Sequence, residues 1–373
     1  MLSLLVLAGV FASAAAKPCV GFDANWGLYV FGRDHDVSLG PVGGWSANPV
    51  GTSTLTRTGR PPFDGPNTQC FFSQYQNSLY VLNADTTQPS NIHIFSFDAQ
   101  AWSTQKVSAD GTDPNSLLAI LDRNTNVFFA LSNSQLYSLD MASLTQSDGG
   151  TRGWQFVQAP AFAQNNAYPK PVMALAENHI HFLNVGKPAT ADIFVIHFSY
   201  MQPEQQVFAP IEDGGAGAPS TTGHTASIFK GVDAVQTKFA FVPDDGAATW
   251  VFDVISNTTQ TLKGPTDKST LMIAASQREI VQMTTSGDVY WMPYNPEDAQ
   301  ANYGANWSRI ALNLTTPTPA TGNSSSQPSS GPTSSGAATT TTTGAPSGSR
   351  LSAVLHSGVA ALGLSLTGLW ILF

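Results

Sequence analysis

The 373-residue chain contains little charge. Charged residues make up 11% of the sequence, whereas soluble domains usually contain about 25%. A coiled coil needs abundant Glu, Lys and Arg, so the composition excludes one. The formal net charge is −9, and the lysines and arginines form no cluster, which argues against a nucleic-acid-binding protein. Hydrophobic residues still make up 42% of the chain, so a sizeable core can be buried.

The chain also lacks the short motifs that mark common catalytic and metal sites. It contains no HExxH, no CxxC, no GxxxxGK[ST] phosphate loop and no GxSxG nucleophile elbow. A zinc site with cysteine ligands is not expected, because the only cysteines are Cys19 and Cys70 and a disulfide would use both. The sequence therefore predicts no metal and no cofactor.

Both ends of the chain have the pattern of targeting segments. Residues 1–16 form an apolar run that ends in small residues, as in a secretory signal peptide, and the run is shorter than the ~20 residues of a membrane helix. Residues 358–373 form a second apolar run, preceded by a polar spacer and by small residues. This order predicts a glycosylphosphatidylinositol (GPI) anchor signal over residues 350–373 with the lipid on Ser347, or alternatively on Gly348 or Gly344. A retained membrane span over residues 351–373 is the alternative.

Residues 315–349 have the composition of a glycosylated, disordered stalk. Of these 35 residues, 19 are Ser or Thr and none is charged, so the segment cannot form a core. Sequons for N-glycosylation occur at Asn257, Asn306, Asn313 and Asn323. These features predict an extracellular protein held at the cell surface, on the outer leaflet of the plasma membrane or in the cell wall.

The two cysteines fit the same compartment. In an oxidising environment a lone pair of cysteines is expected to form a disulfide between Cys19 and Cys70. Two buried free thiols are the alternative.

Between residues 17 and 314 the sequence repeats a pattern of short apolar strands. Six similar segments start 41 to 59 residues apart. After each of the last five, a second apolar segment begins 8 to 13 residues after the start of the first. Gly, Asn, Asp and Pro separate the segments, which is typical of β-strands joined by turns. A further strand often precedes each pair. The six segments are residues 28–32, 79–83, 127–131, 180–184, 239–243 and 280–284.

This period is typical of a β-propeller. The units resemble kelch repeats of the galactose-oxidase central domain and related fungal propellers, on residues 28–32, 79–83, Phe97 and Trp102. The resemblance implies an all-β propeller over residues 17–314, with six blades of four-stranded antiparallel sheets. A seventh blade would require an extra strand set within residues 45–65, and a β-sandwich pair or a β-helix is the other alternative. The family's copper site is not expected here, because the disulfide would use every cysteine.

If each unit begins with its innermost strand, Cys19 and Cys70 lie on adjacent inner strands. Their disulfide would then join the first two blades.

Charged loop residues provide the candidate binding site. In a propeller, the loop after the second strand of a blade and the connection to the next blade share one face, where binding is expected. Here this face carries many acidic residues and a few arginines. The sequence predicts ligand contact by Arg33, Asp34, Asp36, Asp244 and Asp245. An ordinary solvated loop set is the alternative.

A histidine cluster is the other candidate. His179 and His181 alternate on one strand and His197 lies on its partner, so the three could bind a metal, although hydrogen bonding within the sheet is the simpler interpretation.

The resulting functional hypothesis is a GPI-anchored, monomeric propeller that binds a glycan or a protein ligand at the cell surface without catalysis. The alternative is an anchored enzyme that acts on glycans in the central channel. That alternative predicts converging carboxylates or histidines on the inner strands, where the predicted segments contain only Asp122 as a charged residue.

Overall fold

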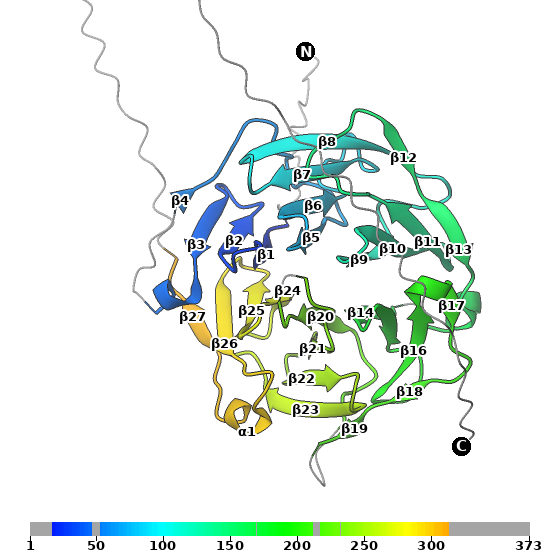
Figure 1. The fold of residues 1–373 in the computed structure, drawn as a ribbon, viewed down its shortest axis with the longest axis vertical. Coiled ribbons are helices and arrows are strands. Elements are labelled where there is room, and N and C mark those ends of the chain that lie inside the picture. Colours follow the sequence, from blue (N-terminus) through cyan, green and yellow to red (C-terminus); the bar gives the residue numbers. More distant parts are fainter. Residues whose placement is uncertain (1–16, 47–52, 169, 212–216, 232, 313–373) are drawn as a thin grey trace, which may run out of the picture. The chain divides into compact units, whose positions relative to one another are not determined.

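The computed structural model describes residues 17–46, 53–168, 170–211, 217–231 and 233–312. These residues form six small β-sheets arranged around a central axis (Figure 1). The predicted all-β propeller with six blades is therefore confirmed. The proposed signal peptide, stalk and anchor signal, together with Asn313, Asn323 and Ser347, lie outside the described residues. No helix among the described residues is long and apolar enough to cross a bilayer.

Each of the first three blades is built on four strands that lie side by side in chain order. Blade 1 contains β1 (Cys19–Phe22), β2 (Leu28–Phe31), β3 (Val37–Gly40) and β4 (Ser53–Thr54). Blade 2 contains β5 (Gln69–Ser73), β6 (Ser78–Leu82), β7 (Ile92–Ser96) and β8 (Ala101–Ser108). Blade 3 contains β9 (Leu118–Asp122), β10 (Val127–Ser132), β11 (Gln135–Asp140) and β13 (Gln155–Gln158).

The other three blades repeat this order. Blade 4 contains β14 (Val172–Ala176), β15 (His179–Leu183) and β16 (Thr190–Val195), and β16 pairs with both β17 (Tyr200–Met201) and β18 (Gln206–Val207). Blade 5 contains β20 (Gly223–Ile228), β21 (Lys238–Pro243), β22 (Ala248–Asp253) and β23 (Thr258–Lys263). Blade 6 contains β24 (Thr270–Ala275), β25 (Glu279–Thr284), β26 (Val289–Pro293) and β27 (Ser308–Ile310).

Two short strands extend a neighbouring blade. The chain between β11 and β13 contributes β12 (Thr151–Gly153), which pairs in parallel with β8 of blade 2. The chain between β18 and β20 contributes β19 (Ala209–Pro210), which pairs in parallel with β23 of blade 5. Each covers the exposed edge of an outer strand and so removes a free row of backbone donors and acceptors.

Helical segments are short. They comprise the 3-10 turns η1 (Val42–Gly44), η2 (Ala161–Asn166) and η3 (Ile196–Phe198), and the single helical turn α1 (Ala299–Asn302).

The repeated segments found in the sequence are the second strands of the blades, from β2 to β25. The inner strands are β1, β5, β9, β14, β20 and β24, and each contacts the next around the axis. The sequence pattern did not predict β20, because its residues GHTASI lack an apolar run. In the region that could have held a seventh blade, the described residues (45–46 and 53–65) contribute the single strand β4, which pairs with β3 at the outer edge of blade 1.

The core is divided among the interfaces between blades. Six clusters of buried side chains occur, one at each interface between neighbouring sheets. Between blades 1 and 2, for example, the Phe31 ring lies 5.1 Å from that of Phe95 and 5.8 Å from that of Trp102, centroid to centroid. Strands that are apolar on both faces fit this arrangement, because each sheet is covered by a neighbour on either side. The blades therefore depend on one another for their stability.

The ring closes by side-chain packing between blades 1 and 6. Blade 1 comes from the N-terminal part of the described chain and blade 6 from its C-terminal part. No described strand pairs with both sheets. Val20 and Val30 of blade 1 pack in one cluster with Val281 and Val289 of blade 6. On the other side of blade 1, the disulfide joins Cys19 of β1 to Cys70 of β5, with Cα atoms 6.0 Å apart. The predicted disulfide between the first two blades is confirmed.

We predict that replacing both cysteines by serine lowers the free energy of unfolding by about 4 kcal/mol, from the entropy of the loop of about 50 residues that the bond closes. Urea denaturation of the two proteins, followed by tryptophan fluorescence, measures the difference. Equal midpoints and equal slopes would show that the interface between blades 1 and 2 holds without the bond.

Candidate functional site

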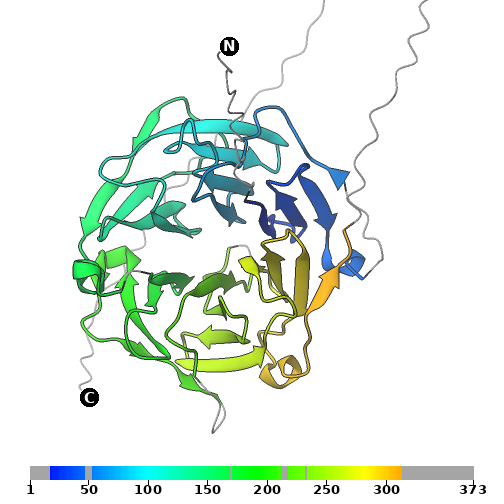
Figure 2. The same cartoon turned by 180° about the vertical axis from the view of Figure 1, so that it is seen from behind.

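The predicted binding residues lie on one face of the propeller. We call it the upper face; it carries the loops between the second and third strands of each blade and the connections from blade to blade. Arg33, Asp34 and Asp36 lie in the β2–β3 loop of blade 1, and Asp244 and Asp245 in the β21–β22 loop of blade 5. Blade 6 lies between the two groups (Figure 2). None of the five residues lines any of the cavities described below.

Asp36 is a buried structural residue. Its side chain is fully buried and accepts two hydrogen bonds from Arg60 Nε, at 3.0 and 2.9 Å, and one from the backbone N–H of Gly32 at 3.0 Å. Burial raises the pKa of Asp36 and the Arg60 charge opposes the rise. Because its oxygens already bind Arg60 and Gly32, Asp36 presents no free carboxylate at the surface.

Arg33 also holds the upper face together. Its Nη1 donates to the carbonyl of Gly287 in blade 6 at 2.5 Å, and its own carbonyl accepts from Arg60 Nη2 at 2.6 Å. Asp34 lies between these anchored residues and is exposed.

The acidic pair of blade 5 forms a turn. Asp245 accepts from the N–H of Ala247 at 2.9 Å, and Asp244 accepts from the hydroxyl of Thr222 at 2.5 Å. His224 Nε2 lies 3.5 Å from Asp244. Burial lowers the pKa of His224, while Asp244 acts in the opposite direction. Both carboxylates remain at the surface, so they stay candidates for contact with a ligand.

The upper face also contains a polar cavity of about 500 Å³, which we call the upper-face pocket. Its walls come from the connections that enter blades 2, 3 and 4 and from the β10–β11 turn. Most of the polar lining groups are amides and hydroxyls, joined by one tyrosine and one lysine, and no carboxylate is among the described lining residues. The polar lining residues are Asn67, Ser116, Ser132, Asn133, Ser134, Asn166, Tyr168 and Lys170.

Hydrogen bonds to the backbone hold the walls of this pocket. Asn133 and Ser134 both have positive φ, 51° and 61°, as in a two-residue type I′ hairpin turn. Gln164 of η2 donates to the carbonyl of Ser134 at 2.9 Å, which ties the loop entering blade 4 to this turn. On the opposite wall, Asn67 Nδ2 donates to the carbonyl of Leu117 at 2.7 Å. The walls are thus fixed, while Tyr168 and Lys170 are exposed.

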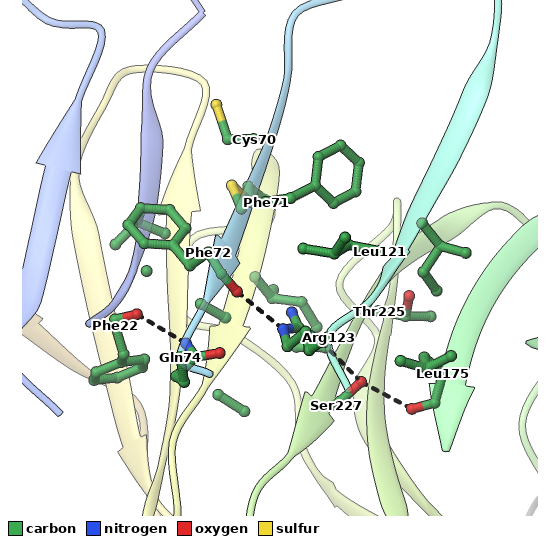
Figure 3. Close-up of a pocket in the computed structure, with 18 of the residues that line it drawn as sticks. Phe22, Cys70, Phe71, Phe72, Gln74, Leu121, Arg123, Leu175, Thr225 and Ser227 are labelled. Atoms are coloured by element: carbon green, nitrogen blue, oxygen red, sulfur yellow. Dashed lines mark hydrogen bonds between the residues drawn. The ribbon is translucent and has the colours of Figure 1, made fainter. Parts of the chain in front are cut away.

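The central channel lies beside this pocket. Its upper part is a cavity of about 240 Å³ that shares Leu118 and Pro171 with the upper-face pocket. Its lower part is a cavity of about 130 Å³ lined by all six inner strands. Figure 3 shows this lower part, with the Arg123 side chain among mostly apolar neighbours. The strand pattern in the sequence does not indicate Arg123, because this residue follows the last residue of β9.

The channel does not show the groups that the enzymatic alternative predicts. On the described inner strands, Asp122 and His224 are the titratable residues outside the disulfide. Asp122 accepts from the N–H of Asn124 at 3.2 Å and from the hydroxyl of Thr125 at 2.6 Å, so it stabilises the β9–β10 turn. No converging pair of carboxylates or histidines lines the described channel.

The three histidines of blade 4 do not form a metal site. The rings of His179 and His181 lie 6.4 Å apart, and His181 Nε2 lies 3.4 Å from the carbonyl oxygen of Ala176. Burial lowers the pKa of His181 to about 3, so its ring is neutral. His197 is exposed. Within the described ranges, no three His, Cys, Asp or Glu side chains lie close enough to hold a metal ion.

Asn257 and Asn306, the two sequon residues within the described ranges, are both exposed. Their glycosylation stays a prediction.

The comparisons with known proteins support the fold alone. No protein-family model and no curated protein sequence matches the chain. A solved structure described as YjhT covers 80% of this chain and 98% of its own length, with 7% identity and a TM-score of 0.50. A streptogramin B lyase structure shows 11% identity and a TM-score of 0.45 over 82% of this chain and 86% of its own. Virginiamycin B lyase from Staphylococcus aureus shows 9% identity and a TM-score of 0.43 over 81% and 86%.

We predict different effects for the two neighbouring aspartates of the β2–β3 loop. Asp36→Ala leaves Arg60 without its partner and should lower the free energy of unfolding by about 2 to 3 kcal/mol. Asp34→Ala changes an exposed side chain and should stay within about 0.5 kcal/mol of the wild type. Thermal and urea unfolding of both variants decide the point. Similar losses in the two variants would contradict the structural role of Asp36.

Proposed function

We propose that this protein is a non-catalytic binding propeller that holds a glycan in its upper-face pocket. The single observation that carries the proposal is the lining of that pocket. Its volume of about 500 Å³ falls within the range of about 300 to 1,000 Å³ that is typical of small-molecule sites. Amides and hydroxyls can both donate and accept hydrogen bonds, which suits a ligand rich in hydroxyl groups.

The tyrosine and the lysine add to this match. Tyr168 lies at the pocket wall with its side chain partly exposed, where an aromatic ring can pack on the apolar face of a sugar and its hydroxyl can bond to the rim. Lys170 places a cation at the pocket, and the described lining residues include no carboxylate to neutralise it. A neutral glycan, or one with a weakly acidic substituent, fits these groups best. The exposed carboxylates Asp34, Asp244 and Asp245 lie elsewhere on the same face and offer a second surface for a protein ligand.

The proposal places the propeller at the cell surface. It rests on the sequence features alone: the signal-like residues 1–16, the Ser/Thr-rich segment 315–349 and the anchor-like residues 350–373. A lipid on Ser347 would tether the propeller, and the Ser/Thr-rich residues 315–349 would separate it from the anchor. Release from intact cells by a phosphatidylinositol-specific phospholipase C tests the anchor. Protein that stays on the cells after this treatment would favour the retained membrane span.

We predict that glycan binding depends on the upper-face pocket. Once an array identifies a bound oligosaccharide, Tyr168→Ala and Asn166→Ala should each weaken its affinity about tenfold, because each removes a contact inside the pocket. Isothermal titration calorimetry measures the loss.

The matched control is a variant that carries Asp34→Asn, Asp244→Asn and Asp245→Asn together. It changes the acidic loops and leaves the pocket intact, so its affinity should equal that of the wild type. If the control loses binding and the pocket variants keep it, the acidic loops are the binding surface. Release of shorter sugars during the assay would instead favour the enzymatic alternative.

A further inference from the structure

A guanidinium group lies inside the lower part of the central channel. Arg123 Nε donates to the carbonyl of Phe72 at 2.9 Å, and Nη1 lies 3.4 Å from the Ser227 hydroxyl. The guanidinium carbon lies 5.2 Å from the centre of the Phe229 ring. A guanidinium has five N–H donors, so these contacts use only part of its hydrogen-bonding capacity.

The residues that line this cavity include no Asp or Glu. The adjacent Asp122 is bound within the β9–β10 turn by Asn124 and Thr125. Burial lowers the pKa of Arg123 to about 10, an effect that Asp122 opposes, and the group stays cationic at neutral pH. A cation in a cavity whose described lining residues include no carboxylate is unfavourable. An anion that enters the cavity would offset this cost.

A second polar group in the same cavity lacks a partner. The side chain of Gln74 is 3% exposed, and its Nε2 donates to the carbonyl of Phe22 at 2.8 Å. That bond fixes the orientation of the amide. Its Oε1 is buried and receives no hydrogen bond from the described part of the chain. Buried polar atoms in folded proteins nearly always have a partner, so the cavity that contains the guanidinium also supplies a position for a hydrogen-bond donor.

The size of the cavity limits what can occupy it. Its volume is about 130 Å³, and an engineered apolar cavity of about 150 Å³ holds one benzene molecule. The occupant is therefore a small molecule rather than a chain of sugars. Apart from Arg123, Gln74 and Ser227, most of the wall is apolar, and includes Phe72, Leu121, Leu175 and Ile273.

We infer that the lower channel binds a small hydroxy acid, with its carboxylate on Arg123 and its hydroxyl donating to Gln74 Oε1. The carboxylate and guanidinium would form charge-assisted hydrogen bonds in an environment shielded from water, which strengthens them. This site lies at the opposite end of the channel from the upper-face pocket. The inference therefore goes beyond the proposed function, and neither depends on the other.

Calorimetry of the purified wild-type protein with four matched probes tests the ligand chemistry. We expect 2-hydroxypropanoate, 3-hydroxypropanoate or both to bind. Propanoate, which lacks the hydroxyl, should bind about five- to tenfold more weakly. The uncharged 2-hydroxypropanamide should show no measurable binding. If neither hydroxy acid binds, or if the amide binds as well as the acids, the inference is wrong.

Variants test the two residues. Arg123→Met should weaken the affinity for the hydroxy acid at least about tenfold. Gln74→Leu should abolish the preference for the hydroxy acid over propanoate. Lys170→Gln, which alters the upper-face pocket, should change neither the affinity for the hydroxy acid nor the preference over propanoate. An unchanged affinity in Arg123→Met would overturn the inference. Near-UV circular dichroism checks that each variant is folded, and if Arg123→Met fails this check, the probe series and Gln74→Leu still decide.

Discussion

The packing of apolar side chains between neighbouring sheets is the interaction on which the rest of this structure depends. Each blade is a small sheet that cannot bury both of its faces alone, and the six core clusters lie at the six interfaces. The same requirement explains the low charge of the chain, because strands covered on both faces leave few positions for charged residues. It also makes the interface between blades 1 and 6 critical, since side-chain packing closes the ring there. The Cys19–Cys70 bond then fixes the first inner strand to its other neighbour.

Because of this constraint, the polar groups that could bind a ligand lie in the loops and at the ends of the channel. Inner strands that are mostly apolar line the axis, so polar groups gather where strands end. Arg123 follows the last residue of β9, and Gln74 follows β5. The upper-face pocket arises in the same way, from connections that enter three consecutive blades. A rigid ring thus positions these loops, which is where binding sites are usually found.

The sequence predicted the propeller because the period of the strands is a local signal. It also predicted the disulfide, because the chain contains only two cysteines and its ends have the pattern of a secreted protein. It did not predict β20, whose polar residues hide a strand, or Arg123, whose position in the channel depends on where β9 ends. Asp36 was expected to contact a ligand. The polar loop sequence does not reveal that this carboxylate is buried and paired with Arg60, 24 residues away. The upper-face pocket was also missed, since residues far apart in sequence form it.

The central claim is that the upper-face pocket, rather than the acidic loops, binds the ligand. Hydrogen–deuterium exchange of the protein with and without a bound oligosaccharide tests it most directly, because exchange reports protection along the backbone. The account predicts slower exchange in the β10–β11 turn and in the connection that contains η2, with no change in the β2–β3 and β21–β22 loops. Protection confined to those two loops would contradict it.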